Sequence, residues 1–296
     1  MQLHGVLAPV VTTFHEKSED LDVAAFTRNV HALVGAGLHG IVVCGSTGEA
    51  ALLTEDERRV LLEAARGATP PDRALLMGTG AESTRQTLKR CADAKTAGAD
   101  AVLVVAPHYY ANAMSIGALR AHYRAVADGS PLPVVLYNIP KYMHFALPAE
   151  LVAELAQHPN VVGIKDSSGD LTMLGGFLKA QSDSFTVLTG NGATFAPALQ
   201  AGARGGILGV ADFAPALCLQ VYAAHQAGDA TAANGLQAAM KPLAAVIVAE
   251  LGVAGVKTAC DVAGLTGGPV RRPLVDLDEA AEQRVRELLS GVVVAA

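Results

Sequence analysis

The sequence predicts an α/β protein, a (β/α)8 or TIM barrel followed by additional C-terminal helices. Two observations indicate this fold. Short, nearly continuous apolar runs alternate with longer helical patterns, as is typical of parallel strands that are covered on both faces. There are eight such runs, spaced roughly 20 to 35 residues apart, and then they stop. Doubly wound sheets show the same alternation, so the count of eight favours the barrel.

Each predicted strand is a buried run rich in Val, Leu, Ile and Ala. In chain order the predicted strands are Gly5–Thr13, Gly40–Cys44, Ala74–Gly78, Ala101–Ala106, Pro133–Tyr137, Val161–Lys165, Phe185–Thr189 and Gly206–Val210.

The helices between these strands carry recognisable start and stop signals. Capping-box patterns at Thr54–Glu57 and Ser83–Gln86 precede predicted helices at Arg58–Ala65 and Leu88–Ala97. Three helices are predicted to end in an Ala-Gly pair a few residues before a strand, because glycine supplies the left-handed conformation that closes a helix. These pairs are Ala36-Gly37, Ala97-Gly98 and Ala201-Gly202.

Only helical patterns follow the eighth strand. They are Ala214–Ala227, Thr231–Leu251, Gly255–Ala263 and Asp278–Leu289. No linker rich in Pro, Gly or Ser separates them from the barrel. We therefore predict a catalytic barrel at residues 1–228 and a helical extension at residues 229–296 that packs on it.

The composition excludes several classes of protein. Of 296 residues, 51% are hydrophobic and 17% are charged, which is not the composition of a disordered chain. The net charge of −6 and the lack of a basic cluster argue against nucleic-acid binding. No apolar run approaches the roughly 18 residues that span a bilayer, and Met1–Phe14 lacks the pattern of a secretory leader. Because of the missing long apolar run, no membrane partner is expected. Four isolated cysteines in apolar surroundings are interpreted as reduced thiols and predict a cytoplasmic protein; they are Cys44, Cys91, Cys218 and Cys260.

Candidate catalytic residues are polar side chains that end a barrel strand, because active sites lie at the carboxyl ends. Lys165 closes the run Val161–Lys165, and strand alternation points Asp166 to the other face. Desolvation favours the free amine, which can form a Schiff base with a ketone. The alternative is a lysine that reaches out of the barrel mouth to a surface carboxylate. Position alone does not decide between the two.

Two further features lie at the same predicted end of the barrel. Tyr137 ends the preceding strand and is either a general acid and base or a core tyrosine with its hydroxyl at the rim. In the turn Gly45–Glu49, backbone N–H groups and two hydroxyls suit a carboxylate, although an ordinary strand-to-helix turn has the same composition. The segment Gly205–Gly209 either binds phosphate or only allows close packing. The nine histidines show no metal-ligand spacing, so no metal site is expected.

Five motifs together make the sequence resemble one family over nearly its whole length. They are G-S-T-G-E at Gly45–Glu49, P-x-Y-Y at Pro107–Tyr110, Y-N-I-P at Tyr137–Pro140, G-I-K-D at Gly163–Asp166 and G-G-P-x-R-x-P at Gly267–Pro273. Their order and spacing resemble the dihydrodipicolinate synthase / N-acetylneuraminate lyase (DapA-like) family. That family comprises pyruvate-dependent class I aldolases on (β/α)8 barrels, usually homotetramers built as dimers of dimers.

The resemblance implies a role for each matching residue. Lys165 would form the imine with pyruvate, and Tyr137 would move protons. Ser46 would relay the proton, and Tyr110 would complete the relay in a neighbouring subunit's site. Among the substrate-binding residues, Gly45 and Thr47 belong to the turn that holds the pyruvate carboxylate, and the carbonyl of Ile207 would line the pocket. The family's reaction needs no metal and no dissociable cofactor, since the lysine imine with the substrate is covalent.

One segment departs from the family pattern and bears on the substrate. Where dihydrodipicolinate synthases usually carry Arg-Thr-Gly, this chain has Tyr142, Met143 and His144. A tyrosine cannot make the bidentate carboxylate clamp of an arginine, although Lys141 or His144 could compensate. The stretches Leu132–Tyr137, with His122–Asp128 before it, and Val161–Asp170 look closest to 4-hydroxy-2-oxoglutarate aldolases.

The sequence therefore predicts a lyase that makes or cleaves a C–C bond between pyruvate and an aldehyde through an imine on Lys165. The preferred substrate is a 4-hydroxy-2-oxoglutarate or a 2-oxo-3-deoxy acid. Alternatives within the family are a 4-hydroxy-tetrahydrodipicolinate synthase, which joins pyruvate and aspartate semialdehyde, and a hydratase-aldolase. Outside it, the alternatives are a phosphosugar isomerase that uses Gly205–Gly209 and a non-enzymatic 2-oxo acid sensor. Expected partners are small-molecule substrates and further copies of the chain in a homotetramer.

Overall fold

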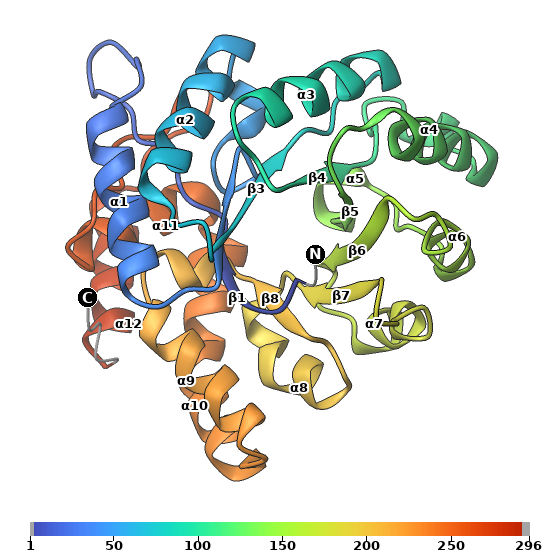
Figure 1. Cartoon of the computed structure of the whole chain (residues 1–296). Helices are drawn as coiled ribbons and strands as arrows, with labels where there is room; N and C mark the ends of the chain where they lie inside the picture. The colour runs from blue at the N-terminus through green and yellow to red at the C-terminus, as the bar shows by residue number, and fades with distance from the viewer. Residues whose placement is uncertain (1–2, 292–296) are drawn as a thin grey trace.

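The structure, a computed structural model, describes residues 3–291 and contains the predicted closed barrel of parallel strands. The strands form a ring surrounded by helices (Figure 1). Each strand pairs with its neighbours in chain order, and β8 pairs back onto β1. The strands are β1 Gly5–Ala8, β2 Gly40–Val43, β3 Ala74–Gly78, β4 Ala101–Val105, β5 Val134–Asn138, β6 Val161–Asp166, β7 Thr186–Thr189 and β8 Gly205–Ile207.

Six of the eight predicted strands agree with the structure to within one residue at each end. The first and the last were predicted too long. β1 ends at Ala8 because Pro9 has no N–H to donate, and beyond it the hydroxyl of Thr12 donates to the carbonyl of Gly48. β8 ends at Ile207 because the chain turns into the short helix η4 at Gly209–Asp212.

The predicted helix signals are present. Thr54 and Glu57 form the reciprocal capping box of α2, which starts earlier and is longer than predicted. Ser83 accepts a hydrogen bond from the Gln86 N–H at the start of α3. The glycines of the three Ala-Gly pairs all have left-handed φ values, between 95° and 115°. The helices of the barrel are α1 Val23–Gly35, α2 Glu55–Ala68, α3 Thr84–Thr96, α4 Ile116–Gly129, α5 Pro140–Met143, α6 Ala149–Leu155, α7 Leu171–Leu178, α8 Phe195–Gln200 and α9 Pro215–Gln226.

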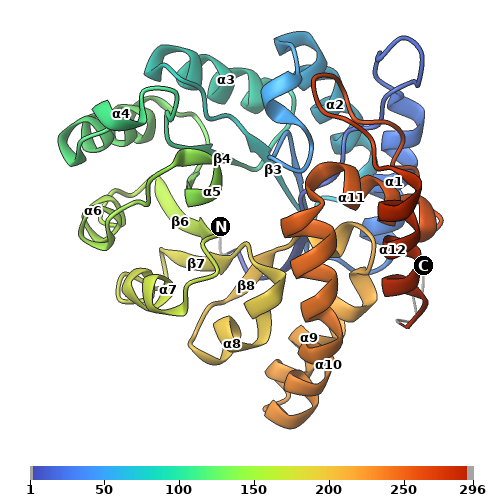
Figure 2. The same cartoon turned by 180° about the vertical axis from the view of Figure 1, so that it is seen from behind.

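Further helices follow the barrel and gather on one side of the ring (Figures 1 and 2). They are α10 Ala230–Pro242, η5 Leu243–Glu250, α11 Gly252–Val262 and α12 Glu279–Ser290. The sequence predicted one α-helix at Thr231–Leu251, but the chain changes to a π-helix in η5. The change begins directly after Pro242, whose ring removes a backbone donor from the helix. The division into residues 1–228 and 229–296 stays a prediction.

One helical run within residues 3–291, Ala230–Glu250, is long and apolar enough to cross a membrane by length and composition. The prediction that no run approaches this length therefore needs correction. Polar contacts attach the same run to the barrel: the Gln237 side chain donates to the carbonyl of Gly192 and accepts from the N–H of Ala196. We therefore interpret it as a helix that packs on the protein.

Candidate active site

Lys165 lies at the carboxyl end of β6 with its side chain inside the barrel mouth. The residue is 5% exposed, and its Nζ lies 4.5 Å from the centroid of the Tyr137 ring. The two residues are partners in the register between β5 and β6. Sheet pairing thus places an amine and a phenol side by side, because parallel strands in register point equivalent residues to the same face.

The neighbouring Asp166 points the other way. It accepts hydrogen bonds from Asn138 Nδ2 at 2.8 Å and from the hydroxyl of Ser168 at 2.8 Å. Burial raises the pKa of Asp166, while the bonds from Asn138 and Ser168 act against that shift. None of the ion pairs formed by residues 3–291 includes Lys165. The lysine is therefore available to a substrate.

The turn after β2 brings a hydroxyl to the phenol. Ser46 Oγ lies 3.5 Å from the Tyr137 hydroxyl. The turn closes tightly, since the N–H groups of Gly48 and Ala50 both donate to the carbonyl of Gly45, at 3.1 and 3.2 Å. Glu49 at its end has a left-handed φ of 56°. Ser46 and Thr47 at its tip remain partly exposed, facing the barrel mouth.

A cavity of about 120 Å³ joins these groups. Six residues named from the sequence line it: Ser46, Thr47, Tyr137, Tyr142, Lys165 and Ile207. Loops after other strands and the C-terminal helices supply the rest of the wall, which includes Pro9, Ile139, Lys141, Ser167, Gly190, Asn191, Gly209, Val248, Ala249, Val253 and Val256. No Asp or Glu of residues 3–291 lines the cavity. With two lysines in its wall, the cavity suits an anionic ligand.

Three residues predicted from the sequence lie away from this wall. Gly45 is buried, and its carbonyl closes the turn. His144 is exposed at the end of α5, where its left-handed φ of 63° ends the helix. Tyr110 is 69% exposed beside Tyr109, with 5.0 Å between the ring centroids. Tyr110 does not line the cavity of its own chain, so the role that the resemblance implies for it, in a neighbouring subunit's site, stays a prediction.

Sequence reasoning missed Gly190, which directly follows β7, the strand that pairs with β6. A Cβ at position 190 would lie 1.9 Å from Ser167 Oγ and 2.8 Å from Lys165 Cε. Only glycine leaves room for the lysine side chain at this point. Lys165 was found as a polar residue that ends an apolar run, whereas Gly190 and Asn191 come directly after the run that ends at Thr189.

Asp212 in η4 is a second missed residue. It is 1% exposed, and neither of its carboxylate oxygens has a hydrogen-bond partner among the described residues. Burial raises the pKa of this carboxyl well above its usual range, and the charge of Lys165 acts against that shift. The position of Asp212 inside a short helix after β8 gives no pattern that the sequence could reveal.

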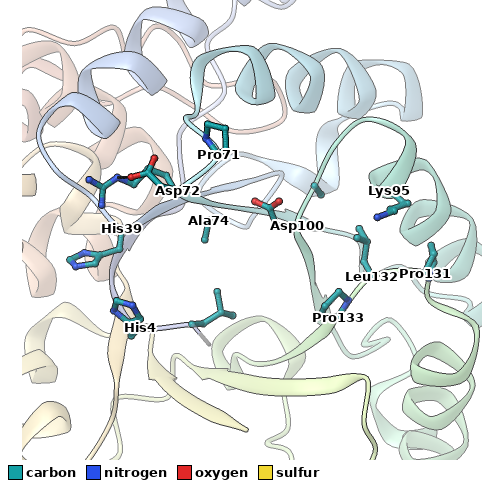
Figure 3. A pocket seen from close by; sticks show the side chains of 13 residues that line it. His4, His39, Pro71, Asp72, Ala74, Lys95, Asp100, Pro131, Leu132 and Pro133 are labelled. Atoms are coloured by element: carbon teal, nitrogen blue, oxygen red, sulfur yellow. Dashed lines mark ion pairs between the residues drawn. The ribbon is translucent and has the colours of Figure 1, made fainter. Parts of the chain in front are cut away.

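In the segment Gly205–Gly209, the first two glycines lie in close contact with their neighbours, and phosphate binding by the segment stays a prediction. A Cβ at Gly205 would lie 2.0 Å from the carbonyl oxygen of Gly5, and one at Gly206 would lie 2.9 Å from the Leu208 side chain. These glycines therefore allow close packing, which was one of the two interpretations. A larger cavity of about 590 Å³ is lined by residues at the amino ends of the strands, such as His4 and His39 (Figure 3), and Lys165 is not among its lining residues.

The chain is similar in sequence to known proteins over nearly its whole length. The model of the dihydrodipicolinate synthetase family matches residues 2–292. A 4-hydroxy-tetrahydrodipicolinate synthase of Methanoculleus marisnigri is 37% identical over 96% of this chain and 98% of its own length. An uncharacterised DapA-like lyase of Halobacterium salinarum is 37% identical over 94% of this chain and 90% of its own length.

Solved structures agree with these sequence matches. YagE, a prophage protein of E. coli K12 that belongs to the dihydrodipicolinic acid synthase family and was solved in complex with pyruvate, superposes with a TM-score of 0.93. It is 28% identical, and the match covers 100% of both chains. The predicted family and the predicted lyase class are thereby confirmed, whereas the closer likeness to 4-hydroxy-2-oxoglutarate aldolases stays a prediction. The chain belongs to the dihydrodipicolinate synthetase family, whose members are pyruvate-dependent lyases.

Proposed function

We propose that this protein makes or cleaves a C–C bond between pyruvate and an aldehyde through an imine on Lys165. The observation that carries the proposal is the convergence of three groups at the barrel mouth. The Lys165 amine lies beside the Tyr137 ring, and the Tyr137 hydroxyl lies 3.5 Å from Ser46 Oγ. An amine without an ion-pair partner, with a phenol and a hydroxyl beside it, is the arrangement that imine chemistry requires.

In cleavage, the amine of Lys165 attacks the carbonyl carbon of a 4-hydroxy-2-oxo acid, and water leaves. The protonated imine then accepts the electron pair of the breaking C–C bond as an enamine. Tyr137 takes the proton from the 4-hydroxyl group as the aldehyde forms, with Ser46 as its relay. Protonation of the enamine and hydrolysis release pyruvate and the free lysine. Positioned proton transfer of this kind contributes about 10²–10⁴-fold to a rate.

Other cavity residues orient the substrate. The turn that carries Ser46 and Thr47 presents backbone N–H groups and a hydroxyl, which suit the carboxylate next to the carbonyl. Ile207, at the end of β8, faces the same cavity. Fixing the carboxylate holds the carbonyl carbon near Lys165, and such orientation lowers the entropic part of the barrier. The reaction written here uses no metal and no dissociable cofactor.

Our preferred substrates are 4-hydroxy-2-oxoglutarate and 2-oxo-3-deoxy acids. The motivating feature is Tyr142, which lines the cavity at the position where synthases usually carry the arginine that binds aspartate semialdehyde. The second candidate is 4-hydroxy-tetrahydrodipicolinate synthase activity, which the name of the Methanoculleus relative favours. The third candidate is a hydratase-aldolase, which would use the same imine. The non-enzymatic candidate is a sensor that binds a 2-oxo acid without turnover.

A retro-aldol screen separates these candidates. The protein is incubated with a panel of 2-oxo acids, and released pyruvate is detected by a coupled assay. The expected result is pyruvate release from a 4-hydroxy-2-oxo acid, with little condensation of pyruvate and aspartate semialdehyde. Tyr142→Arg is expected to raise that condensation. Efficient condensation by the unchanged protein would favour the synthase, and pyruvate binding without turnover of any substrate would favour the sensor.

A further inference from the structure

The turn that carries Ser46 and Thr47 ends in a fully buried acid. Glu49 is 3% exposed. Its Oε1 lies 2.5 Å from Lys257 Nζ, and its Oε2 accepts a hydrogen bond of 2.8 Å from the backbone N–H of Arg271. Both partners belong to the chain after the barrel, more than two hundred residues away in the sequence. The proposed catalytic reaction above makes no use of any of these three residues.

Lys257 on α11 is as deeply buried as the acid. The residue is 1% exposed, and its amine donates to the carbonyl of Pro269 at 2.5 Å. The amine also lies 4.5 Å from the centroid of the Phe14 ring, and the Arg271 guanidinium lies 4.2 Å from the same centroid. One lysine thus contacts the turn after β2, the loop after β1 and the segment that follows α11.

Arg271 extends this cluster to a helix. Its guanidinium binds both carboxylate oxygens of Glu57 in the first turn of α2, at 2.6 and 2.9 Å, and the carbonyl of Leu52 at 3.0 Å. The segment Gly267–Pro273 therefore contacts the chain at Glu49 and, through Arg271, at Leu52 and Glu57 after it. Two motifs of the sequence, the turn Gly45–Glu49 and this C-terminal segment, form one connected unit.

The same elements also form the wall of the cavity. Val256, directly before Lys257, lines the cavity together with Val253 of α11, and Ser46 and Thr47 line it from the turn. Replacing a buried ion pair by apolar residues is often neutral or stabilising, so stability alone gives no reason for one here. A pair that fixes one geometry is useful where a sub-ångström placement matters, as it does for groups that orient a substrate.

We propose that Glu49 and Lys257 are positioning residues, which lock the Ser46–Thr47 turn onto α11 so that it meets the carboxylate of a 2-oxo acid bound at Lys165. This inference has a structural part, the rigidity of the turn, and a catalytic part that rests on the proposed function. Neither residue lines the cavity.

Two variants and a matched control test it. Lys257→Met removes the cation and leaves Glu49 Oε1 buried without its ion-pair partner, while Oε2 keeps its bond from the Arg271 N–H. The double variant Glu49→Gln/Lys257→Met replaces the pair by neutral groups of similar size and serves where the single variant does not fold. Val285→Ala is the control, because it destabilises α12 through a residue that is 0% exposed and leaves every contact of Glu49 intact.

The first measurement is hydrogen exchange of peptides that cover residues 44–53. In the double variant we expect this region to exchange at least about tenfold faster than in Val285→Ala, since the ion pair is its tie to α11. Equal exchange in the two proteins would overturn the inference. This measurement needs no substrate, so it decides the structural part even where the proposed function fails.

The second measurement is borohydride trapping of the imine at increasing pyruvate concentration. The expected result is a half-saturating concentration about tenfold higher in the double variant, with the maximal trapping rate within about threefold of the unchanged protein. Unchanged half-saturation together with faster exchange would show a merely structural role and would overturn the catalytic part. A lack of trapping in the unchanged protein would instead contradict the proposed function itself.

Discussion

At the scale of single residues, the reactivity of Lys165 follows from what surrounds it. The strand β6 turns the neighbouring Asp166 to the outer face, where Asn138 and Ser168 satisfy it. The amine is left beside the Tyr137 ring, 4.5 Å from its centroid. Asp212 is buried without a hydrogen-bond partner among the described residues, and none of residues 3–291 that line the cavity beside Lys165 is an acid. A substrate carbonyl therefore meets an amine that no ion pair holds.

Lys141 offers a prediction about the second substrate. It lines the cavity, and its amine donates to the backbone carbonyl of Ala249 at 2.8 Å, whereas His144 lies outside the wall. A neutral carbonyl is a partner that an anionic substrate can displace. We expect Lys141→Met to reduce kcat/KM about tenfold for substrates with a distal carboxylate and to leave trapping of pyruvate unchanged. His144→Gln is the matched control, and an equal loss in both variants would contradict the assignment.

His122 predicts how stability depends on pH. Burial lowers its pKa from 6.5 to about 4, and its Nδ1 is hydrogen-bonded to Thr84 at 2.9 Å. The folded state therefore binds a proton at His122 less readily than the unfolded state does. The contribution of neutral His122 to the free energy of unfolding is complete above pH 6.5 and is lost as the pH falls toward 4. Between pH 7 and 5, we expect the protein to lose about 2 kcal/mol more unfolding free energy than His122→Gln does. Urea unfolding at the two pH values measures this, and equal losses would refute it.

At the scale of elements, α2 shows a local sequence signal that has a long-range role. Thr54 Oγ1 accepts from the N–H of Glu57, and the Glu57 carboxylate accepts from the N–H of Thr54. The same carboxylate binds Arg271, and this contact is the main reason that the pKa of Glu57 is lowered. The start of the helix is thus tied to the C-terminal segment.

Removing this cap tests the coupling between the two. Thr54→Ala is expected to lower the free energy of unfolding by about 1 kcal/mol, because an orphan N–H is left at the helix start. Ser115→Ala removes a similar cap from α4, whose first turn carries no acid that could bind an arginine. We expect a larger loss from Thr54→Ala, since freeing Glu57 also weakens its bond to Arg271. Thermal unfolding of both variants measures the difference, and a larger loss from Ser115→Ala would contradict the coupling.

At the scale of the whole molecule, the sequence was sufficient for the barrel and for the core of the site. Eight apolar runs implied eight strands, and the residues that end them, Tyr137 and Lys165, lie together because closure of the sheet brings successive strand ends into one mouth. What the sequence could not reveal depends on distant contacts. The burial of Lys257 against Glu49 joins chain segments far apart, and the π-helix of η5 depends on how the chain continues after Pro242.

The state of assembly is a prediction of its own. Tyr109 and Tyr110 are 78% and 69% exposed, side by side on the loop after β4, and we expect this surface to be covered by a second copy in a homotetramer. Sedimentation of the unchanged protein is expected to give a tetramer, and Tyr110→Ala is expected to lower kcat. The solved relatives include a monomeric dihydrodipicolinate synthase variant, so a monomer is the alternative that sedimentation must distinguish from the tetramer. A purely monomeric protein with full activity would remove Tyr110 from the catalytic set.

The proposed reaction depends on a covalent bond between Lys165 and pyruvate. The most direct measurement is to reduce the full-length protein with borohydride in the presence of pyruvate, digest it and map the peptides by mass spectrometry. We expect one pyruvate-derived adduct on the peptide that carries Lys165 and none in Lys165→Met. An unmodified Lys165, or an adduct confined to another lysine such as Lys141, would contradict the central claim.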